Sequence, residues 1–203
     1  MTISAAILTG GLSRRMGSDK ALLPIRGRPM ALFIAGILKR VTGTDPFLVA
    51  KCPKKYESLG LAVARDAMPY RCALAGVHAA LRHAATRRVL ITACDQPFLS
   101  PRLLRVMIAT PGDVVVCEAD RRLRPFPLIF STDLLDAVAD SFSYGVLSIQ
   151  ENLFVSGFPA ILDDRRVRDL DPELATFRNL NDPASFERQA RRPPPARRLT
   201  VCR

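Results

Sequence analysis

Residues 8–27 read LTGGLSRRMGSDKALLPIRG and directly follow the apolar segment SAAIL, which begins at Ser4. Between Gly10 and Lys20, this stretch contains three glycines, two adjacent arginines and a lysine within eleven residues. A hydrophobic core gains little from such residues, because charged side chains are almost never fully buried unless they are paired. The stretch therefore predicts a polar turn at the end of a buried strand.

Short apolar runs alternate with segments of helical period along the first half of the chain. After Pro29, apolar residues recur every three or four positions as far as Val41, which predicts an amphipathic helix. This alternation is typical of a largely parallel sheet with helices on both faces, so we predict an α/β fold with three Rossmann-like layers, α/β/α, and a mostly parallel mixed sheet. Strands are expected over residues 4–8, 46–50, 61–65, 88–94 and 113–117, and helices over 30–41, 73–84 and 103–109.

The second half of the chain is less regular. Asp182-Pro183 is a start signal for a final helix, because an acidic N-cap precedes a proline in the first turn. Residues 1–190 are predicted to form one domain, and the proline- and arginine-rich residues 191–203 a disordered basic tail. Between these points we expect strands over 127–130 and 158–163, helices over 133–142 and 148–156, and an extended segment over 177–181.

Positive charge is concentrated at one end of the chain. Six arginines lie in the last sixteen residues, which contain no acid, and without them the formal net charge falls from +11 to +5. Such a tail attracts RNA through its phosphates, but no aromatic residues are interleaved with it, so nucleic acid is not the expected partner. No apolar run approaches eighteen residues and no secretory signal is evident, which predicts a cytoplasmic protein without a membrane span. The five cysteines form no C-x-x-C pair and are interpreted as free thiols.

The turn after the first strand is suited to phosphate groups. Ligands of open α/β sheets bind beyond the carboxyl ends of the strands, where Gly10 and Gly11 allow the backbone N–H groups to approach an anion closely. Arg14, Arg15 and Lys20 add positive charge. A solvated basic turn is the alternative, but the whole stretch favours phosphate binding. It contains neither G-x-x-x-x-G-K-[ST] nor G-x-G-x-x-G, which argues against a P-loop phosphotransferase and a dinucleotide-dependent dehydrogenase.

Two aspartates follow predicted strands. Asp66 comes directly after residues 61–65, and Asp95 after residues 88–94. Mg²⁺ typically binds one or two carboxylates together with phosphate oxygens and water, so each aspartate is a candidate ligand beside a bound nucleotide. The alternative is an aspartate that only caps the next turn. Pro97 stiffens the turn after Asp95, which makes Asp95 the stronger candidate.

Other polar segments leave their roles open. Asn179 and Asn181 lie on one side of the expected extended segment, where their amides either bind a ligand or satisfy the loop backbone. Residues 121–130, RRLRPFPLIF, are interpreted as a proline-stiffened basic loop that feeds a strand and is a candidate wall for a second substrate. His78 and His83 are predicted to be surface or packing residues of a helix. No Ser-His-Asp or Cys-His set suggests nucleophilic catalysis.

Several motifs together resemble a known group of enzymes. LTGGLSRRMGSDKALLPIRGRP resembles the signature L-A-G-G-x-S-x-R-M-G-x-D-K-x-L of nucleotidyltransferases with the nucleotide-diphospho-sugar transferase fold. The double arginine, C-D-x-P and N-x-N point to one branch of that group, the molybdenum cofactor guanylyltransferases. The branch pattern continues in order through residue 183 with Asp66, LAG (74–76), CDQP (94–97) and NLNDP (179–183).

This resemblance implies transfer of GMP from GTP to molybdopterin, with or without bound molybdenum, release of pyrophosphate, and Mg²⁺ as cofactor. It also implies transient contact with proteins that deliver molybdopterin or mature molybdoenzymes. The roles it implies are nucleotide binding by Leu8, Thr9, Gly10, Gly11 and Asp66, phosphate binding and catalysis by Arg15 and Lys20, Mg²⁺ binding and catalysis by Asp95, and contact near molybdopterin by Asn179 and Asn181.

Three places depart from the family pattern. Thr9 stands for the alanine of L-A-G-G, Cys72-Ala73 for the G-P before LAG, and Ala50 and Lys51 where the family has a nucleotide-contacting asparagine. These departures concern the base more than the phosphates. A molybdopterin cytidylyltransferase, or a related nucleotidyltransferase with another acceptor, is therefore the nearest alternative. A noncatalytic homologue whose tail recruits RNA or a partner is the alternative from another class.

Overall fold

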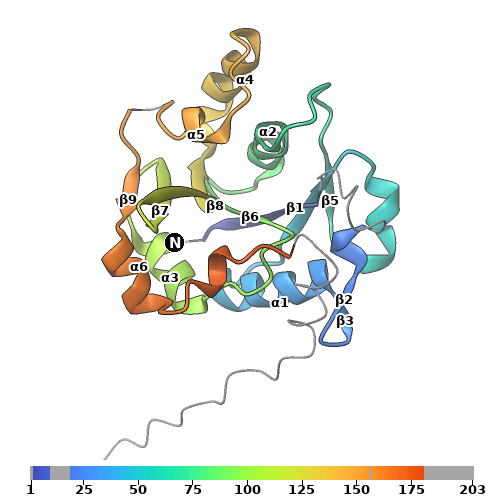
Figure 1. The fold of residues 1–203 in the computed structure, drawn as a ribbon. Helices are drawn as coiled ribbons and strands as arrows, with labels where there is room; N and C mark the ends of the chain where they lie inside the picture. The colour runs from blue at the N-terminus through green and yellow to red at the C-terminus, as the bar shows by residue number, and fades with distance from the viewer. Residues whose placement is uncertain (1, 10–18, 156, 181–203) are drawn as a thin grey trace, which may run out of the picture.

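A seven-stranded mixed sheet forms the middle layer of the protein (Figure 1), in a computed structural model that describes residues 2–9, 19–155 and 157–180. The strand order is β5-β4-β1-β6-β8-β7-β9. Four neighbouring pairs are parallel, and the two pairs made by β8 are antiparallel. The strands are β1 (Ser4–Leu8), β4 (Phe47–Ala50), β5 (Val63–Arg65), β6 (Arg88–Ala93), β7 (Val114–Ala119), β8 (Arg122–Ser131) and β9 (Ala160–Leu162).

Helices cover both faces of this sheet, which confirms the predicted three-layer α/β/α fold and its mostly parallel mixed sheet. One face is covered by α1 (Met30–Thr42), α3 (Pro101–Ala109) and α6 (Asp164–Leu170). The other is covered by α2 (Ala73–His83), α4 (Leu135–Ser143) and α5 (Ile149–Asn152), shown above the sheet in Figure 1. No helix among the described residues is long and apolar enough to cross a membrane.

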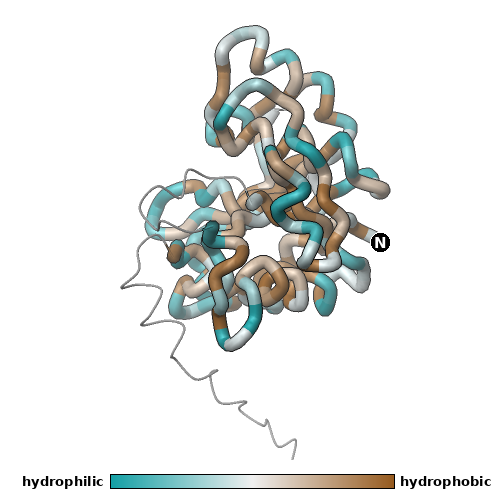
Figure 2. Tube along the Cα trace, turned by 90° about the vertical axis from the view of Figure 1, so that its right-hand side faces the viewer, coloured by the Kyte–Doolittle hydropathy of each residue, from teal (hydrophilic) through white to brown (hydrophobic). Residues whose placement is uncertain are grey.

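The alternation of side chains along each strand explains why both faces need a helical cover. In β1, Ala5 and Ile7 pack on the α1 side, whereas Ala6 and Leu8 pack on the α2 side. All four are buried, so the strand reads as a continuous apolar run. Hydrophobic residues accordingly dominate the central strands in Figure 2.

Residues 121–130 were expected to be a loop followed by a strand at 127–130, and this expectation is wrong. β8 begins at Arg122 because Asp120 and Arg121, with φ of 53° and 58°, make a tight turn that returns the chain onto β7. Arg122 then pairs with Ala119, and Arg124 with Cys117. The basic segment is therefore part of the sheet rather than a loop.

Two other expectations need correction. Of the helix expected over 148–156, the described residues form only α5, and residues 153–155 form turns. The segment expected to be extended over 177–181 instead begins with the end of a 3-10 helix (Ala175–Phe177), since the Asp171 carboxylate accepts the Ala175 and Thr176 N–H groups at 3.1 and 2.8 Å. Elements that were not predicted are α6, the hairpin β2 (Pro24–Ile25) with β3 (Arg28–Pro29), and the 3-10 helices at Pro53–Leu59 and Lys20–Leu22. The final helix expected after Pro183 and the tail lie outside the described residues.

Gly76, in the LAG segment of α2, allows this helix to approach β1 closely. A Cβ atom at Gly76 would lie 3.1 and 3.2 Å from the two Cδ atoms of Leu8. Leu8 is only 7% exposed and lies at the last position of its strand. The glycine therefore sets the spacing between the helix and the strand end.

Replacing Gly76→Val is expected to lower the free energy of unfolding by about 1–3 kcal/mol, because the added methyl groups overpack the contact with Leu8. The control is Gly36→Ala on α1, where a Cβ atom meets nothing within 4 Å. That change is expected to raise stability by about 0.5–1 kcal/mol through helix propensity. Urea unfolding of both variants measures the difference, and equal effects would contradict the close packing at Gly76.

Candidate active site

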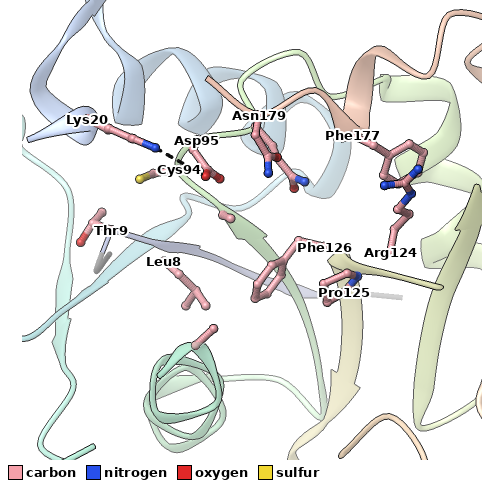
Figure 3. A pocket seen from close by; sticks show the side chains of 13 residues that line it. Leu8, Thr9, Lys20, Cys94, Asp95, Arg124, Pro125, Phe126, Phe177 and Asn179 are labelled. Atoms are coloured by element: carbon pink, nitrogen blue, oxygen red, sulfur yellow. Dashed lines mark ion pairs between the residues drawn. The ribbon is translucent and has the colours of Figure 1, made fainter. Parts of the chain in front are cut away.

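A pocket lies at the point where the order of the strands reverses. β1 and β6 are neighbours, but the chain continues from β1 to β4 on one side of this pair and from β6 to β7 on the other. Crevices of this kind are the usual ligand sites of open α/β sheets. The pocket has a volume of about 360 Å³ (Figure 3) and is lined by Leu8, Thr9, Lys20, Ala73, Ala93, Cys94, Asp95, Gln96, Arg124, Pro125, Phe126, Phe177 and Asn179.

Asp95 and Lys20, two of the predicted catalytic residues, meet in this pocket. Asp95 follows β6 directly, and its carboxylate Oδ2 lies 3.8 Å from the Lys20 Nζ. Burial raises the pKa of Asp95, and the nearby Lys20 charge only partly opposes this effect. The described residues thus compensate the charge of this carboxylate incompletely, as is common for functional groups in clefts.

Asp19, which the sequence reasoning did not single out, anchors the residue next to Lys20. Its Oδ1 accepts the Ala21 N–H at 3.0 Å and caps the short 3-10 helix that begins at Lys20. Its Oδ2 accepts the Tyr56 hydroxyl and pairs with Lys55 Nζ, both at 2.6 Å. Burial of Tyr56 and its hydrogen bond to Asp19 raise the pKa of the phenol. The S-D-K sequence was the available signal, but the partner Tyr56 lies 37 positions away.

The opposite wall of the pocket is formed by the irregular half of β8. Val115 of β7 pairs with Ile129 and Cys117 pairs with Arg124, so residues 125–128 bulge opposite Val116 alone. The pairing of β6 with β8 also stops at Ile91 and Leu128. Bulges redirect side chains next to ligand sites. Here the bulge brings Arg124, Pro125 and Phe126 to the pocket, which agrees with the interpretation of this segment as a wall.

The segment before residue 181 closes the pocket from a third direction. The Leu180 N–H donates to the Asp95 carbonyl oxygen at 2.8 Å, and Leu180 is 1% exposed. This contact holds exposed Asn179 at the rim, as Figure 3 shows. Of the two asparagines in NLN, only Asn179 is described, since Asn181 lies outside the described residues.

The remaining predicted residues have three different outcomes. Leu8 and Thr9 line the pocket, and the Thr9 hydroxyl donates to the Val49 carbonyl oxygen at 2.8 Å. Asp66 does not line it: its Oδ1 pairs with Lys51 Nζ at 2.9 Å and accepts the Met68 N–H at 3.1 Å. Asp66 therefore caps the turn that follows β5, which is the alternative role expected from the sequence. Gly10, Gly11 and Arg15 lie outside the described residues.

On α2, His78 is buried and His83 is exposed, which agrees with the prediction of surface or packing roles. The His83 ring makes an edge contact with Phe47 at a centroid distance of 4.7 Å, and the His78 ring one with Phe142 at 6.1 Å. Burial, followed by the nearby Arg82 charge, lowers the pKa of His78. Neither histidine lines the pocket.

The donor set of the pocket fits a cation that binds together with a phosphate-bearing substrate. Among the described residues, no group of three or more His, Cys, Asp and Glu side chains is placed to hold a metal ion by protein ligands alone. Mg²⁺ does not need such a cage, because it keeps water and takes substrate phosphate oxygens beside one or two carboxylates. The incompletely compensated carboxylate of Asp95 is suited to this role.

Comparison with known proteins places the chain in a family. The model of the MobA-like NTP transferase domain matches residues 5–152. The chain belongs to this MobA-like family. It is similar to the molybdenum cofactor guanylyltransferase of Desulfosudis oleivorans (30% identity, covering 92% of this chain and 93% of the relative) and to a probable molybdenum cofactor guanylyltransferase of Pelotomaculum thermopropionicum (32% identity, covering 90% and 89%).

A solved structure confirms the MobA-like fold independently of the sequence. The structure of molybdopterin-guanine dinucleotide biosynthesis protein A from Archaeoglobus fulgidus has a TM-score of 0.76 at 22% identity, covering 93% of this chain and 97% of that one. At this level of identity the likeness concerns the fold. The predicted nucleotide-diphospho-sugar transferase architecture is therefore confirmed.

The contacts of Asp19 predict a graded loss of stability. Asp19→Ala removes a cap and leaves the Tyr56 hydroxyl without its acceptor, so the free energy of unfolding is expected to fall by about 2–3 kcal/mol. Tyr56→Phe removes one hydrogen bond and is expected to cost about 1 kcal/mol. Lys55→Gln is the control, because Lys55 is half exposed and such ion pairs contribute about 0–1 kcal/mol. Denaturant unfolding measures the loss of free energy of unfolding for each variant. An equal loss for Lys55→Gln and Asp19→Ala would contradict this ranking.

Proposed function

We propose that this protein transfers GMP from GTP to molybdopterin and releases pyrophosphate. The observation that carries the proposal is the convergence of Lys20 and Asp95 in a pocket at the strand-order reversal of a MobA-like chain. Two relatives that align with more than nine-tenths of the chain are named molybdenum cofactor guanylyltransferase, which supports this choice of nucleotide and acceptor.

In the proposed reaction, an oxygen of the molybdopterin phosphate attacks the α-phosphorus of GTP. The bond between the α-phosphorus and the oxygen bridging to the β-phosphorus breaks, and pyrophosphate leaves with that electron pair. Positioning and electrostatic stabilisation supply most of the rate in phosphoryl and nucleotidyl transfer. Lys20 and Arg15 are assigned to the triphosphate, where their charges stabilise the leaving group.

Asp95 is the residue that would hold Mg²⁺ with the substrate phosphates. Bound there, the ion would neutralise charge on the phosphate oxygens as a Lewis acid. Leu8, Thr9, Gly10, Gly11 and Asp66 are assigned to the nucleoside side of GTP. Asn179 and Asn181 are assigned to the molybdopterin side, in keeping with the position of Asn179 at the rim.

The chain's own residues need not supply a covalent nucleophile or a strong base. A phosphate monoester is largely ionised at neutral pH because its second pKa is about 6. Within the described lining, no histidine is present, and burial raises the pKa of the Cys94 thiol to about 12. Cys94 therefore stays protonated and unreactive at neutral pH. These properties support direct transfer between the two substrates.

Asp95→Asn is expected to reduce pyrophosphate release from GTP and molybdopterin by at least about a hundredfold, because it removes the proposed Mg²⁺ ligand. Its thermal unfolding is expected to change little, since burial already opposes the charge of Asp95. The control is Asp45→Asn, an exposed aspartate paired with Lys39, which is expected to keep full activity. A fully active Asp95→Asn enzyme would exclude Asp95 as the essential ligand, and an inactive wild type would favour a noncatalytic homologue.

We also propose that residues 1–190 form the nucleotidyltransferase domain and that residues 191–203 are a basic tail outside it. The four arginines beyond Arg191 (Arg192, Arg197, Arg198 and Arg203) are then not needed for the chemistry. Truncation after Arg191 is expected to leave turnover intact in the same pyrophosphate assay. A large loss of turnover would assign the tail a role in the reaction.

A further inference from the structure

Gln96 is a buried residue whose side-chain oxygen, Oε1, has no hydrogen-bond partner in the part of the chain that the structure describes. Its side chain lines the pocket beside Asp95, and the residue is 8% exposed. A buried polar atom without a partner costs about 1–3 kcal/mol. Nearly all buried polar groups are paired, so this one requires an explanation. A ligand that engages the Gln96 carboxamide would supply it.

Arg124 provides a second cation on the wall opposite Lys20. Its Nη2 donates to Asp120 Oδ2 at 2.9 Å, its Nε donates to the Ala119 carbonyl oxygen at 3.2 Å, and its guanidinium lies 5.8 Å from the Phe177 ring centroid. These contacts fix the side chain while it remains 30% exposed and lines the pocket. A guanidinium has five N–H donors, so this held group retains donors for an anion.

The two cations lie on different sides of the same carboxylate. Figure 3 shows Thr9 and Lys20 on one side of Asp95, and Arg124, Phe126 and Phe177 on the other. Transfer between a nucleoside triphosphate and a phosphate monoester brings two anions to one centre, with the incoming and leaving oxygens roughly in line. Such a reaction is favoured by a positive charge on each side of the centre, so that each anion has its own cation.

We infer that the β8 side of this pocket is the acceptor subsite, in which Arg124 binds the phosphate of a pterin phosphate monoester and the Gln96 carboxamide hydrogen-bonds the same ligand. Phe126, which is 8% exposed, supplies the apolar wall for the planar heterocycle. The inference rests on the proposed function for the choice of a pterin. It adds two specificity residues, Arg124 and Gln96, to that function. It also explains the bulge in β8, which includes Phe126 and begins directly after Arg124.

The test is a fluorescence titration of the full chain with 6-hydroxymethylpterin phosphate, a fluorescent phosphate monoester that is not a substrate for turnover alone. Arg124→Gln is expected to raise the Kd of this probe at least about tenfold, the effect of losing one charge-assisted contact. Arg122→Gln, which changes an exposed arginine of the same strand outside the pocket lining, is the matched control and is expected to leave the Kd within about twofold.

Gln96→Leu separates a ligand contact from a structural role. Removing an unpartnered buried amide is expected to keep or raise the melting temperature, whereas the Kd of the probe is expected to rise about three- to tenfold. If Gln96 were structural, the variant would lose stability and keep its affinity. GTP is expected to stabilise the wild type and all three variants to the same extent.

Two results would overturn the subsite: a wild type that does not bind the probe, or an Arg124→Gln variant that binds it as tightly as Arg122→Gln does. Failure of the proposed function would look different. In that case the probe would still bind in a manner dependent on Arg124, but GTP and molybdopterin together would release no pyrophosphate.

Discussion

The carboxylate of Asp95 is kept at the carboxyl end of β6, where Lys20 is its one cationic partner among the described residues, and the rest of the described site is arranged around it. Lys20 approaches it to 3.8 Å, and burial raises its pKa despite that charge. The backbone around it is tied on two sides, because the Cys94 N–H donates to the Leu8 carbonyl oxygen and the Asp95 carbonyl oxygen accepts the Leu180 N–H. A carboxylate held in this way contributes little to the stability of the fold. It is suited to bind a cation from outside the protein.

Two departures from regular structure turn this strand end into a pocket. The first is the close approach of α2 to β1 at Gly76, which places Leu8 at the pocket floor. The second is the bulge in β8, which separates its first half from β6 and brings a cation and an aromatic ring to face Asp95. Regular pairing along β8 would have continued the sheet and closed the space in which two substrates must meet.

The local sequence pattern was sufficient to predict the features that depend on residues close together in the chain. The apolar runs and the stripe after Pro29 predicted most elements of the first half, and the position of Asp95 after a strand predicted its place in the site. Features set by distant partners could not be found in this way. The pairing of Asp19 with Tyr56, of Asp66 with Lys51, and of the basic segment with β7 all depend on the tertiary fold.

The central claim is transfer of GMP from GTP to molybdopterin. The sequence motifs define the phosphate contacts more closely than the guanine base, because Thr9 and Lys51 both depart from the family pattern. Thr9 directs its hydroxyl to the Val49 carbonyl oxygen, and Lys51 pairs with Asp66. The most direct measurement is the rate of pyrophosphate release from molybdopterin and Mg²⁺ with GTP or with CTP at equal concentration. Faster release with GTP, by at least about tenfold, is the predicted result. Faster release with CTP, or none with either nucleotide, would contradict the assignment as a guanylyltransferase.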